Sequence, residues 1–208
     1  MTIQSVGPRK TRKQLLSEWR HAEVLDAARG VFGQLGYPGT NVEAIAKAAG
    51  IAKGTIYLYF KSKEEIFAAV LARDMEALTD RTIAAVSAVG PFPERLRVFL
   101  NLRVEYLLTN QDFLRIFFAE FGSRATRSKP VAEAIDKKIR RGLEFLRTCV
   151  EQAIANGEIR AVPPEAAAHA ISDLARGFAE RQLNGWTELT LAEDMEFTRS
   201  MMLRGLQL

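Results

Sequence analysis

The residues best suited to chemistry lie in one short stretch, KGTIYLY, which begins at Lys53. It combines a cation, three hydroxyl groups and a glycine that lets another molecule approach the backbone, on Lys53, Thr55, Tyr57, Tyr59 and Gly54. A cation and hydroxyls on one segment suit hydrogen bonding to phosphates and to the polar edges of bases. This stretch therefore indicates a nucleic-acid contact.

Elsewhere the sequence offers little for catalysis or metal binding. It has no glycine-rich phosphate loop and no nucleophile elbow, and it contains only two histidines. His169 and Asp173 are one helical turn apart, a spacing that a hydrogen bond on a helix surface explains more simply than a catalytic pair. We expect no enzyme, no cofactor and no metal site, and keep a helical-bundle enzyme as the less favoured alternative.

Two short helices are expected to position the 53–59 stretch. Thr40 and Glu43 have the spacing of a capping box, so the first helix should begin at about Asn41. Gly50 should end it in a left-handed turn, and the second helix follows over about 53–59. Two helices joined by three or four residues form a helix-turn-helix, although an ordinary corner between helices has the same pattern.

A third helix is expected to begin just after this motif. Ser62 and Glu65 form a second capping box. Thr40 and Lys63 would then begin the two helices that flank the motif, where a helix N-terminus and a cation both favour phosphate.

The charge distribution favours the nucleic-acid interpretation. Residues 1–63 hold ten Lys or Arg against four Asp or Glu, a net charge of +6, whereas residues 64–208 have a net charge of −2. Since neutralisation of phosphates supplies most non-specific affinity for nucleic acids, a basic segment on a nearly neutral remainder fits a polyanion-binding head.

The run GYPGTNVEAIAKAAGIAKGTIYLYFKSKEEIF resembles the DNA-binding head of the tetracycline-repressor (TetR) family. The resemblance covers about residues 17–71 and includes the aromatic pair Tyr57 and Tyr59. One residue departs from it: Ala52 stands where the family often has Ser or Thr, so the capping hydrogen bond of the second helix should be missing. The resemblance implies an all-helical C-terminal body that binds a small molecule and dimerises.

The predicted fold is all-α, with a three-helix head, a helical ligand-binding and dimerisation body, and about nine helices in total. We assign residues 1–16 to a flexible basic arm, 17–63 to the helix-turn-helix domain and 64–208 to the body. Beyond the head, apolar periodicity and Gly or Pro breaks predict helices over about 62–89, 94–110, 112–122, 130–156, 164–186 and 191–206. The helix before the motif should cover about 19–36.

Aromatic residues are concentrated in two consecutive helices of the body. They can form an ordinary core or line a cavity for an apolar or aromatic ligand, and we assign the ligand site to Phe99, Tyr106, Phe113, Phe117 and Phe121. Polar residues on the same helices could orient a ligand, namely Asn101, Arg103, Glu105 and Glu120. Periodicity alone does not show which of these polar side chains face inward.

The last two helices carry small and apolar residues on more than one side, which favours burial by a second copy of the chain in a four-helix bundle. We therefore expect a homodimer that binds a palindromic operator in double-stranded DNA and acts as a repressor released by a small-molecule effector. The alternative is a DNA-binding regulator whose body recognises a protein partner.

The compartment is predicted from two further features of the sequence. No apolar run approaches the roughly 18 residues that a membrane span needs, so we expect no membrane association. The single cysteine, Cys149, cannot form an internal disulfide, which fits a reducing compartment. We expect a cytoplasmic protein.

Overall fold

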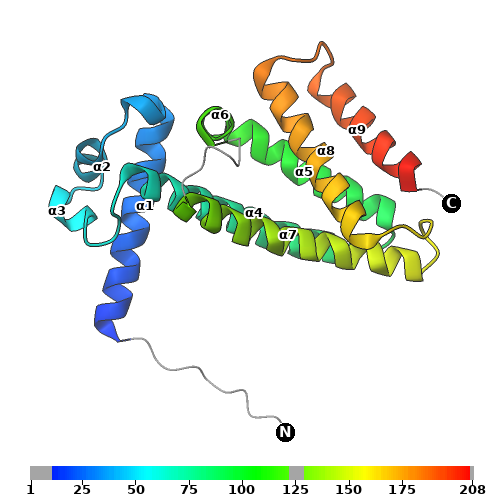
Figure 1. Cartoon of the computed structure of the whole chain (residues 1–208), viewed down its shortest axis with the longest axis horizontal. Coiled ribbons are helices and arrows are strands. Elements are labelled where there is room, and N and C mark those ends of the chain that lie inside the picture. The colour runs from blue at the N-terminus through cyan, green and yellow to red at the C-terminus, as the bar shows by residue number, and fades with distance from the viewer. Residues whose placement is uncertain (1–10, 122–128, 207–208) are drawn as a thin grey trace, which may run out of the picture. The chain divides into compact units, whose positions relative to one another are not determined.

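The computed structural model describes residues 11–121 and 129–206. Over these residues it contains nine helices and no strand, which confirms the all-α prediction. The chain divides into two compact units, Met1–Val70 and Leu71–Leu208. The boundary lies inside the fourth helix, α4 (Lys63–Ser87), rather than at its start as the assignment of residues 17–63 to the head proposes. Figure 1 shows the order of the helices along the chain.

The first unit opens with α1 (Arg12–Gly39), which starts earlier than expected. Thr11 and Gln14 form a capping box, in which Gln14 N–H donates to Thr11 Oγ1 over 3.3 Å and Thr11 N–H donates to Gln14 Oε1 over 2.8 Å. Residues 12–16 of the predicted arm are therefore helical, and residues 1–10 lie outside the described residues. Near its other end α1 is interrupted at Gly36, whose φ of 68° suits glycine.

The cap of α2 (Val42–Ala48) differs from the prediction. Asn41 is the N-cap, and its side chain accepts a 2.8 Å hydrogen bond from Ala44 N–H. Thr40 is buried and donates its hydroxyl to the Gly36 carbonyl over 2.7 Å. The predicted Thr40–Glu43 capping box is wrong because the kinked end of α1 takes the Thr40 side chain, which moves the cap one residue along the chain.

The turn after α2 follows the prediction. Gly50 is left-handed, with φ of 64°, and Ile51 N–H donates to the Ala46 carbonyl over 3.1 Å. The next helix, α3, covers Lys53–Ile56, and Ala52 provides no side-chain cap, as its methyl group requires. The helix is shorter than the predicted 53–59 because the chain turns at residues 57–59 and Phe60 returns to the core.

The core of the first unit is built around aromatic rings. Phe32 and Phe67 meet edge-on with their centroids 5.1 Å apart, and Tyr37 lies 5.9 Å from Phe32 and 5.4 Å from Phe67. The start of α4 is capped locally, since Ser62 Oγ accepts a 3.1 Å hydrogen bond from Glu65 N–H. Glu65 returns its bond to Lys61 N–H rather than to Ser62, so the second predicted capping box is only half formed.

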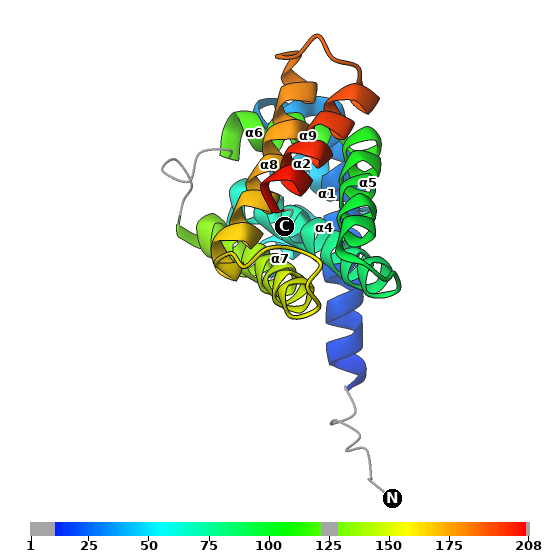
Figure 2. The ribbon, with the colours of Figure 1, turned by 90° about the vertical axis from the view of Figure 1, so that its right-hand side faces the viewer.

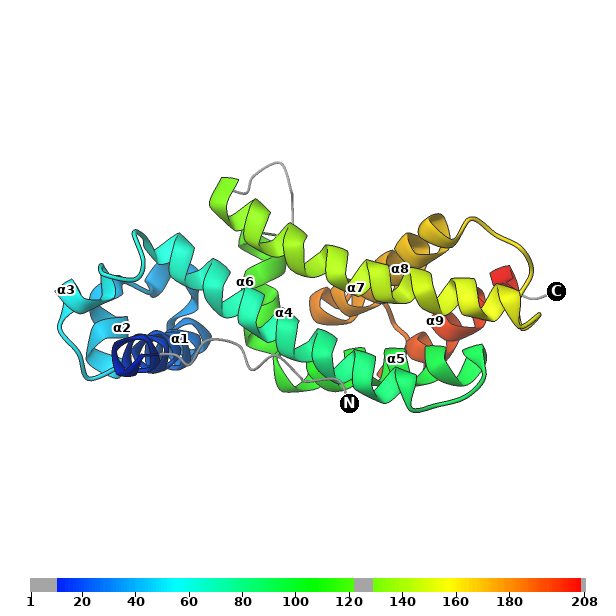
Figure 3. The ribbon, with the colours of Figure 1, turned by 90° about the horizontal axis from the view of Figure 1, so that it is seen from below.

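The second unit is built from the rest of α4 and five further helices. They are α5 (Phe92–Thr109), α6 (Gln111–Phe121), α7 (Lys129–Ala155), α8 (Pro164–Asn184) and α9 (Leu191–Leu206). Figure 2 shows α5, α7 and the α8–α9 pair surrounding a common interior. Figure 3 shows α7 alongside the second half of α4, where Lys138 Nζ and Arg141 Nη2 each lie 2.6 Å from a carboxylate, of Glu76 and Asp80 respectively.

A buried polar network joins α8 to α9. Asp194 is almost completely buried and accepts hydrogen bonds from Arg181 Nη2 over 2.7 Å and from Gln182 Nε2 over 3.0 Å. Because both oxygens of the buried carboxylate are bonded and its charge is paired, the network fixes the register of the two helices.

Candidate functional site

The first unit presents an open cleft of about 420 Å³ beside α3, and it gathers four of the predicted DNA-binding residues. It is lined by Thr40, Asn41, Val42, Glu43, Lys53, Tyr57 and Lys63. Of the other predicted DNA-binding residues, Gly54, Thr55 and Tyr59 lie on or just after α3 but not in the cleft. Residues from the starts of α2, α3 and α4 therefore converge on one surface.

Both hydrogen-bond donors of Thr40, its hydroxyl and its N–H, already bond carbonyls of α1. Its hydroxyl donates to the Gly36 carbonyl and, more weakly at 3.4 Å, to the Val31 carbonyl, and its N–H donates to the Tyr37 carbonyl over 3.3 Å. The phosphate contact predicted for Thr40 would require one of these bonds to be exchanged.

Lys53 shares the cleft with an acidic neighbour. Its Nζ lies 3.4 Å from Glu43 Oε2, and both side chains are largely exposed. Exposed ion pairs contribute about 0–1 kcal/mol, so Lys53 can exchange this carboxylate for a phosphate at little cost.

Lys63 makes a structural contact and keeps N–H donors for a further partner. Its Nζ donates to the Tyr37 carbonyl over 2.7 Å and lies 4.3 Å from the centre of the Tyr37 ring. An ammonium group has three donors, so a phosphate can bind beside these contacts.

The two tyrosines after α3 differ in their surroundings. Tyr57 is 51% exposed and faces the cleft, whereas Tyr59 is half-buried with its ring 6.3 Å from that of His21. His21 also packs against Phe60, with centroids 4.8 Å apart. His21 is therefore part of the packing between α1 and the α3 region, and Tyr57 is the better placed of the two tyrosines to contact a ligand.

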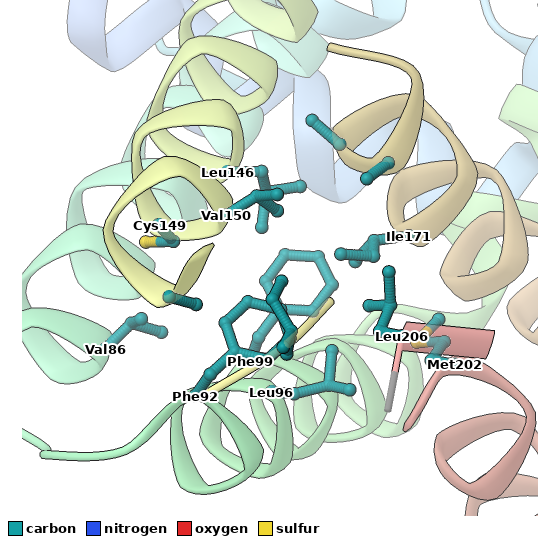
Figure 4. Close-up of a cluster of buried hydrophobic side chains, with 14 of the residues drawn as sticks. Val86, Phe92, Leu96, Phe99, Leu146, Cys149, Val150, Ile171, Met202 and Leu206 are labelled. Carbon is teal, nitrogen blue, oxygen red and sulfur yellow. The ribbon is translucent and has the colours of Figure 1, made fainter. Parts of the chain in front are cut away.

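In the described part of the second unit a large apolar cluster lies between α4, α5, α7, α8 and α9. Figure 4 shows Phe92 and Phe99 of α5 pointing between the helices toward Val150 of α7 and Ile171 of α8. A cavity of about 10 Å³, the size of one water molecule, is lined by Val86, Phe92, Arg95, Leu96, Phe99, Leu146, Cys149 and Ile171. This interior is therefore closed in the present conformation.

The predicted ligand-binding aromatics do not share one cavity. Phe99 belongs to the large cluster, whereas Tyr106 packs against a second cluster made of Leu107, Leu114, Phe178 and Leu183. Phe113 and Phe121 are buried on α6, and Phe117 is half-buried with its ring 5.3 Å from that of Phe118. Of the five, Phe99 alone lines the small cavity described above.

Of the four polar residues expected to orient a ligand, one turns inward. Asn101, Glu105 and Glu120 are exposed, and Glu105 accepts two hydrogen bonds from Arg81. Arg103 is partly buried, with its guanidinium carbon 4.6 Å from the centre of the Phe99 ring. Burial lowers the pKa of Arg103 to about 10, and the neighbouring Tyr106 opposes this shift.

Comparison with known proteins decides the family. Residues 24–70 match the model of bacterial regulatory proteins of the tetR family, and residues 89–180 match a tetracyclin repressor-like C-terminal domain. The chain is 33% identical over 144 residues to the uncharacterized HTH-type transcriptional regulator YhgD of Bacillus subtilis, covering 68% of this chain and 73% of that protein.

The chain belongs to the TetR family.

It is therefore a DNA-binding transcriptional regulator with a ligand-binding C-terminal domain, and the family is not one of enzymes. The TetR head model ends at residue 70, where the first compact unit also ends. The resemblance noted in the sequence is confirmed.

Two solved structures share the fold of this TetR protein. The regulator FadR from Bacillus subtilis in complex with stearoyl-CoA is 22% identical with a TM-score of 0.76, over 89% of this chain and 98% of that one. AibR in complex with isovaleryl coenzyme A and operator DNA is 21% identical with a TM-score of 0.64, over 88% of this chain and 97% of that one.

The described part of the chain shows neither a metal-binding cluster nor a membrane-spanning helix. Within residues 11–121 and 129–206, no group of three or more His, Cys, Asp or Glu side chains is arranged to hold a metal ion. None of the helices described there is both long and apolar enough to span a bilayer.

Three residues of the cleft, Asn41, Val42 and Glu43, were not among the predicted site residues. Asn41 follows Thr40 directly, and both are good N-cap residues, so spacing could not choose between them. Glu43 was assigned to a cap, which hid its place opposite Lys53. The sequence did contain a clue to this pair: Glu43 is a carboxylate on the first helix of the motif, and Lys53 follows it across a short turn.

Proposed function

We propose that this TetR-family protein is a repressor that binds a palindromic operator as a homodimer and is released by an acyl-coenzyme A thioester. The observation that carries the effector is the large apolar cluster between α4, α5, α7, α8 and α9, with the partly buried cation Arg103 against its Phe99 ring. The helices around the cavity of about 10 Å³ would have to separate to admit a ligand. An acyl chain suits the apolar interior, and the cation suits a polar group at the end of that chain.

The names of structural relatives support this class of effector. FadR is described with stearoyl-CoA and AibR with isovaleryl coenzyme A, two thioesters whose acyl chains differ greatly in length. The shared coenzyme A thioester, rather than a particular chain length, is what we carry over to this protein. Among the apolar or aromatic effectors expected from the sequence, we therefore favour acyl-coenzyme A thioesters.

The DNA contacts are proposed from the cleft. Lys53, Gly54 and Thr55 at the start of α3 would reach base edges in the major groove, with Tyr57 beside them. Lys63 would bind phosphate. Thr40 and Tyr59 would hold the DNA-contacting residues in position, since Thr40 bonds the Gly36 carbonyl and Tyr59 packs near His21.

Homodimerisation is proposed from α8 and α9. Large apolar side chains are exposed on α8, on α9 and in the segment between them, namely Leu174, Trp186, Leu189, Phe197 and Met201. Apolar patches of this kind mark protein contacts, and a two-fold pairing of α8 and α9 would cover them with their own copies.

The experiment selects an operator from random duplex DNA and measures its affinity by fluorescence anisotropy. Butyryl-, octanoyl- and palmitoyl-CoA are then added, with coenzyme A and the free acids as controls. We expect at least one acyl-CoA to weaken operator binding tenfold or more, while coenzyme A alone does not. Failure of all three thioesters to bind the protein would contradict the proposed effector.

A protein partner for the body remains a second candidate. The closed interior and the exposed aromatic residues Trp186 and Phe197 are what that alternative predicts. It would be favoured if the purified protein bound operator, ignored every thioester and remained monomeric with its α8–α9 face free.

A further inference from the structure

Arg103 on α5 has no carboxylate partner among the residues that the structure describes. It is partly buried. Its one hydrogen bond runs from Nη1 to Thr82 Oγ1 over a long 3.3 Å. By contrast, a carboxylate contacts each of six other arginines of this unit, namely Arg81, Arg97, Arg141, Arg147, Arg181 and Arg199.

This arrangement leaves binding capacity unused. A guanidinium has five N–H donors in a planar fork, and Thr82 takes one of them. Burial lowers the pKa of Arg103 to about 10, which still leaves it charged at neutral pH. A residue that only filled space here would be better neutral, because a buried charge without a partner destabilises the fold.

The position of Arg103 connects it to the apolar interior. Phe99 lies one turn before Arg103 on α5, and its ring contacts the guanidinium on one side. The same Phe99 lines the small cavity beside Val86 and Leu96 (Figure 4). A chain that entered this interior along Phe99 would therefore bring its end to Arg103.

We propose that Arg103 binds the carbonyl oxygen of the acyl group, either the thioester carbonyl of an acyl-CoA or the carboxylate of the corresponding free acid. The assignment rests on the proposed acyl effector. A phosphate is the poorer candidate because its higher charge would need several cations, and Arg103 is a single cation among apolar neighbours.

Binding of the effector also changes a link between two helices. Thr82 lies on α4 and donates its hydroxyl to the Leu78 carbonyl over 2.7 Å while accepting from Arg103. An acyl oxygen that captures the Arg103 fork competes with Thr82. The hydrogen bond from Arg103 on α5 to Thr82 on α4 is then replaced by a bond from Arg103 to the ligand. Helix α4, which loses this bond, begins in the first unit.

The test pairs protein variants with ligands that differ in one carbonyl. The proteins are the wild type, Arg103→Met, Arg103→Gln and the control Arg81→Met, which removes an exposed arginine bound to Glu105 on the same helix pair. The ligands are palmitoyl-CoA, its thioether analogue S-hexadecyl-CoA, palmitic acid and coenzyme A. Affinities are measured by isothermal titration calorimetry, and melting temperatures are recorded without ligand.

We expect the wild type to bind palmitoyl-CoA about tenfold or more tightly than the thioether, and Arg103→Met to lose this preference. Arg81→Met should keep it. The melting temperature of Arg103→Met should be unchanged or higher, since an unpaired buried charge has been removed, whereas loss of a purely structural arginine would lower it. Arg103→Gln supplies the same comparison if the Met variant does not fold.

The outcomes separate the two proposals. If the wild type binds none of the acyl ligands, the proposed effector is wrong and the role of Arg103 falls with it. If the wild type binds palmitoyl-CoA and Arg103→Met binds it equally well, only the role of Arg103 is overturned. Loss of coenzyme A binding in Arg103→Met would show a phosphate contact and would also overturn the assignment. The affinity for palmitic acid, compared with that for palmitoyl-CoA, shows whether Arg103 prefers a carboxylate or a thioester carbonyl.

Discussion

Asn41 illustrates how one side chain organises the cleft beside α3. Its amide oxygen caps α2 and thereby fixes the helix that carries Glu43 opposite Lys53. We expect Asn41→Ala to destabilise the head by about 1 kcal/mol, because Ala44 N–H loses its acceptor. Native-state hydrogen exchange of the α2 amides measures this locally. Asn41→Ser preserves a capping oxygen and should stay near the wild type, so equal losses in both variants would contradict the cap.

The residues around α3 should separate into two classes. Lys63→Ala should weaken binding to all DNA sequences alike and reduce the salt slope by about one unit, because it removes a phosphate contact. Thr55→Ala and Tyr57→Ala should cost about 1–3 kcal/mol on the selected operator and less on unrelated DNA. Anisotropy on both duplexes at several salt concentrations tests this. A change of base preference in Lys63→Ala would reverse the assignments.

Thr82 gives a residue-level test of the competition described at Arg103. Thr82→Val removes the acceptor of Arg103 Nη1, and the Leu78 carbonyl keeps its place in the helix. We expect palmitoyl-CoA to bind a few times more tightly, since a net hydrogen bond of about 1 kcal/mol no longer competes. Calorimetry measures the change, with Thr79→Val as control because Thr79 bonds only the Met75 carbonyl. Weaker binding by Thr82→Val would count against the competition.

At the scale of single residues the sequence predicted side-chain types better than their partners. It identified Lys53, Tyr57 and Lys63, which the cleft gathers, but misplaced the cap because Thr40 bonds a carbonyl that is exposed only by the kink at Gly36. It could offer Arg103 only as one of four polar candidates. Whether a helical side chain faces a partner depends on the neighbouring helices, which periodicity does not position.

Among the helices, α4 and α7 are joined by charged pairs as well as by their shared apolar cluster. Lys138 pairs with Glu76, and Arg141 pairs with Asp80 and, at 3.9 Å, with Glu76. These pairs are mostly exposed, so their contribution to stability is small. They nonetheless connect a wall of the proposed effector site to the helix that reaches the head.

We expect the double variant Glu76→Gln and Asp80→Asn to change unfolding free energy by less than about 1 kcal/mol but to reduce the effect of palmitoyl-CoA on operator affinity severalfold. The measured quantity is the ratio of operator dissociation constants with and without saturating ligand. Glu94→Gln removes an ion pair within α5, to Arg97, and is the matched control. An unchanged ratio in the double variant would show that this connection does not transmit.

The helices themselves were predicted well because Gly and Pro mark their ends. Gly50, Gly157 and Gly185 all have positive φ where the sequence placed breaks, and Pro164 stands in the first turn of α8. The length of α3 was overestimated, since the buried Phe60 ends it and burial is a tertiary effect. The five aromatic residues assigned to the ligand site do not line one cavity, because their rings pack into separate clusters.

For the whole molecule, the exposed apolar side of α8 and α9 should decide the oligomeric state. Replacing the exposed Phe197 and Met201 of α9 by lysine adds two charges to this surface. We expect a monomer near 23 kDa by light scattering and loss of operator affinity by at least a hundredfold, because each half-site then binds alone. Arg204→Ala, a change on the same helix that leaves the apolar side chains in place, should remain a dimer. A dimeric lysine variant would place the interface elsewhere.

Helix α4 belongs to both units, and its 25 residues contain neither glycine nor proline. Each residue of an α-helix turns the chain by about 100°. An insertion in α4 would therefore rotate the two ends of this helix relative to each other by about 100° per added residue. Alanine insertions after Leu71 should weaken operator binding when one residue is added and partly restore it at seven, which is close to two full turns.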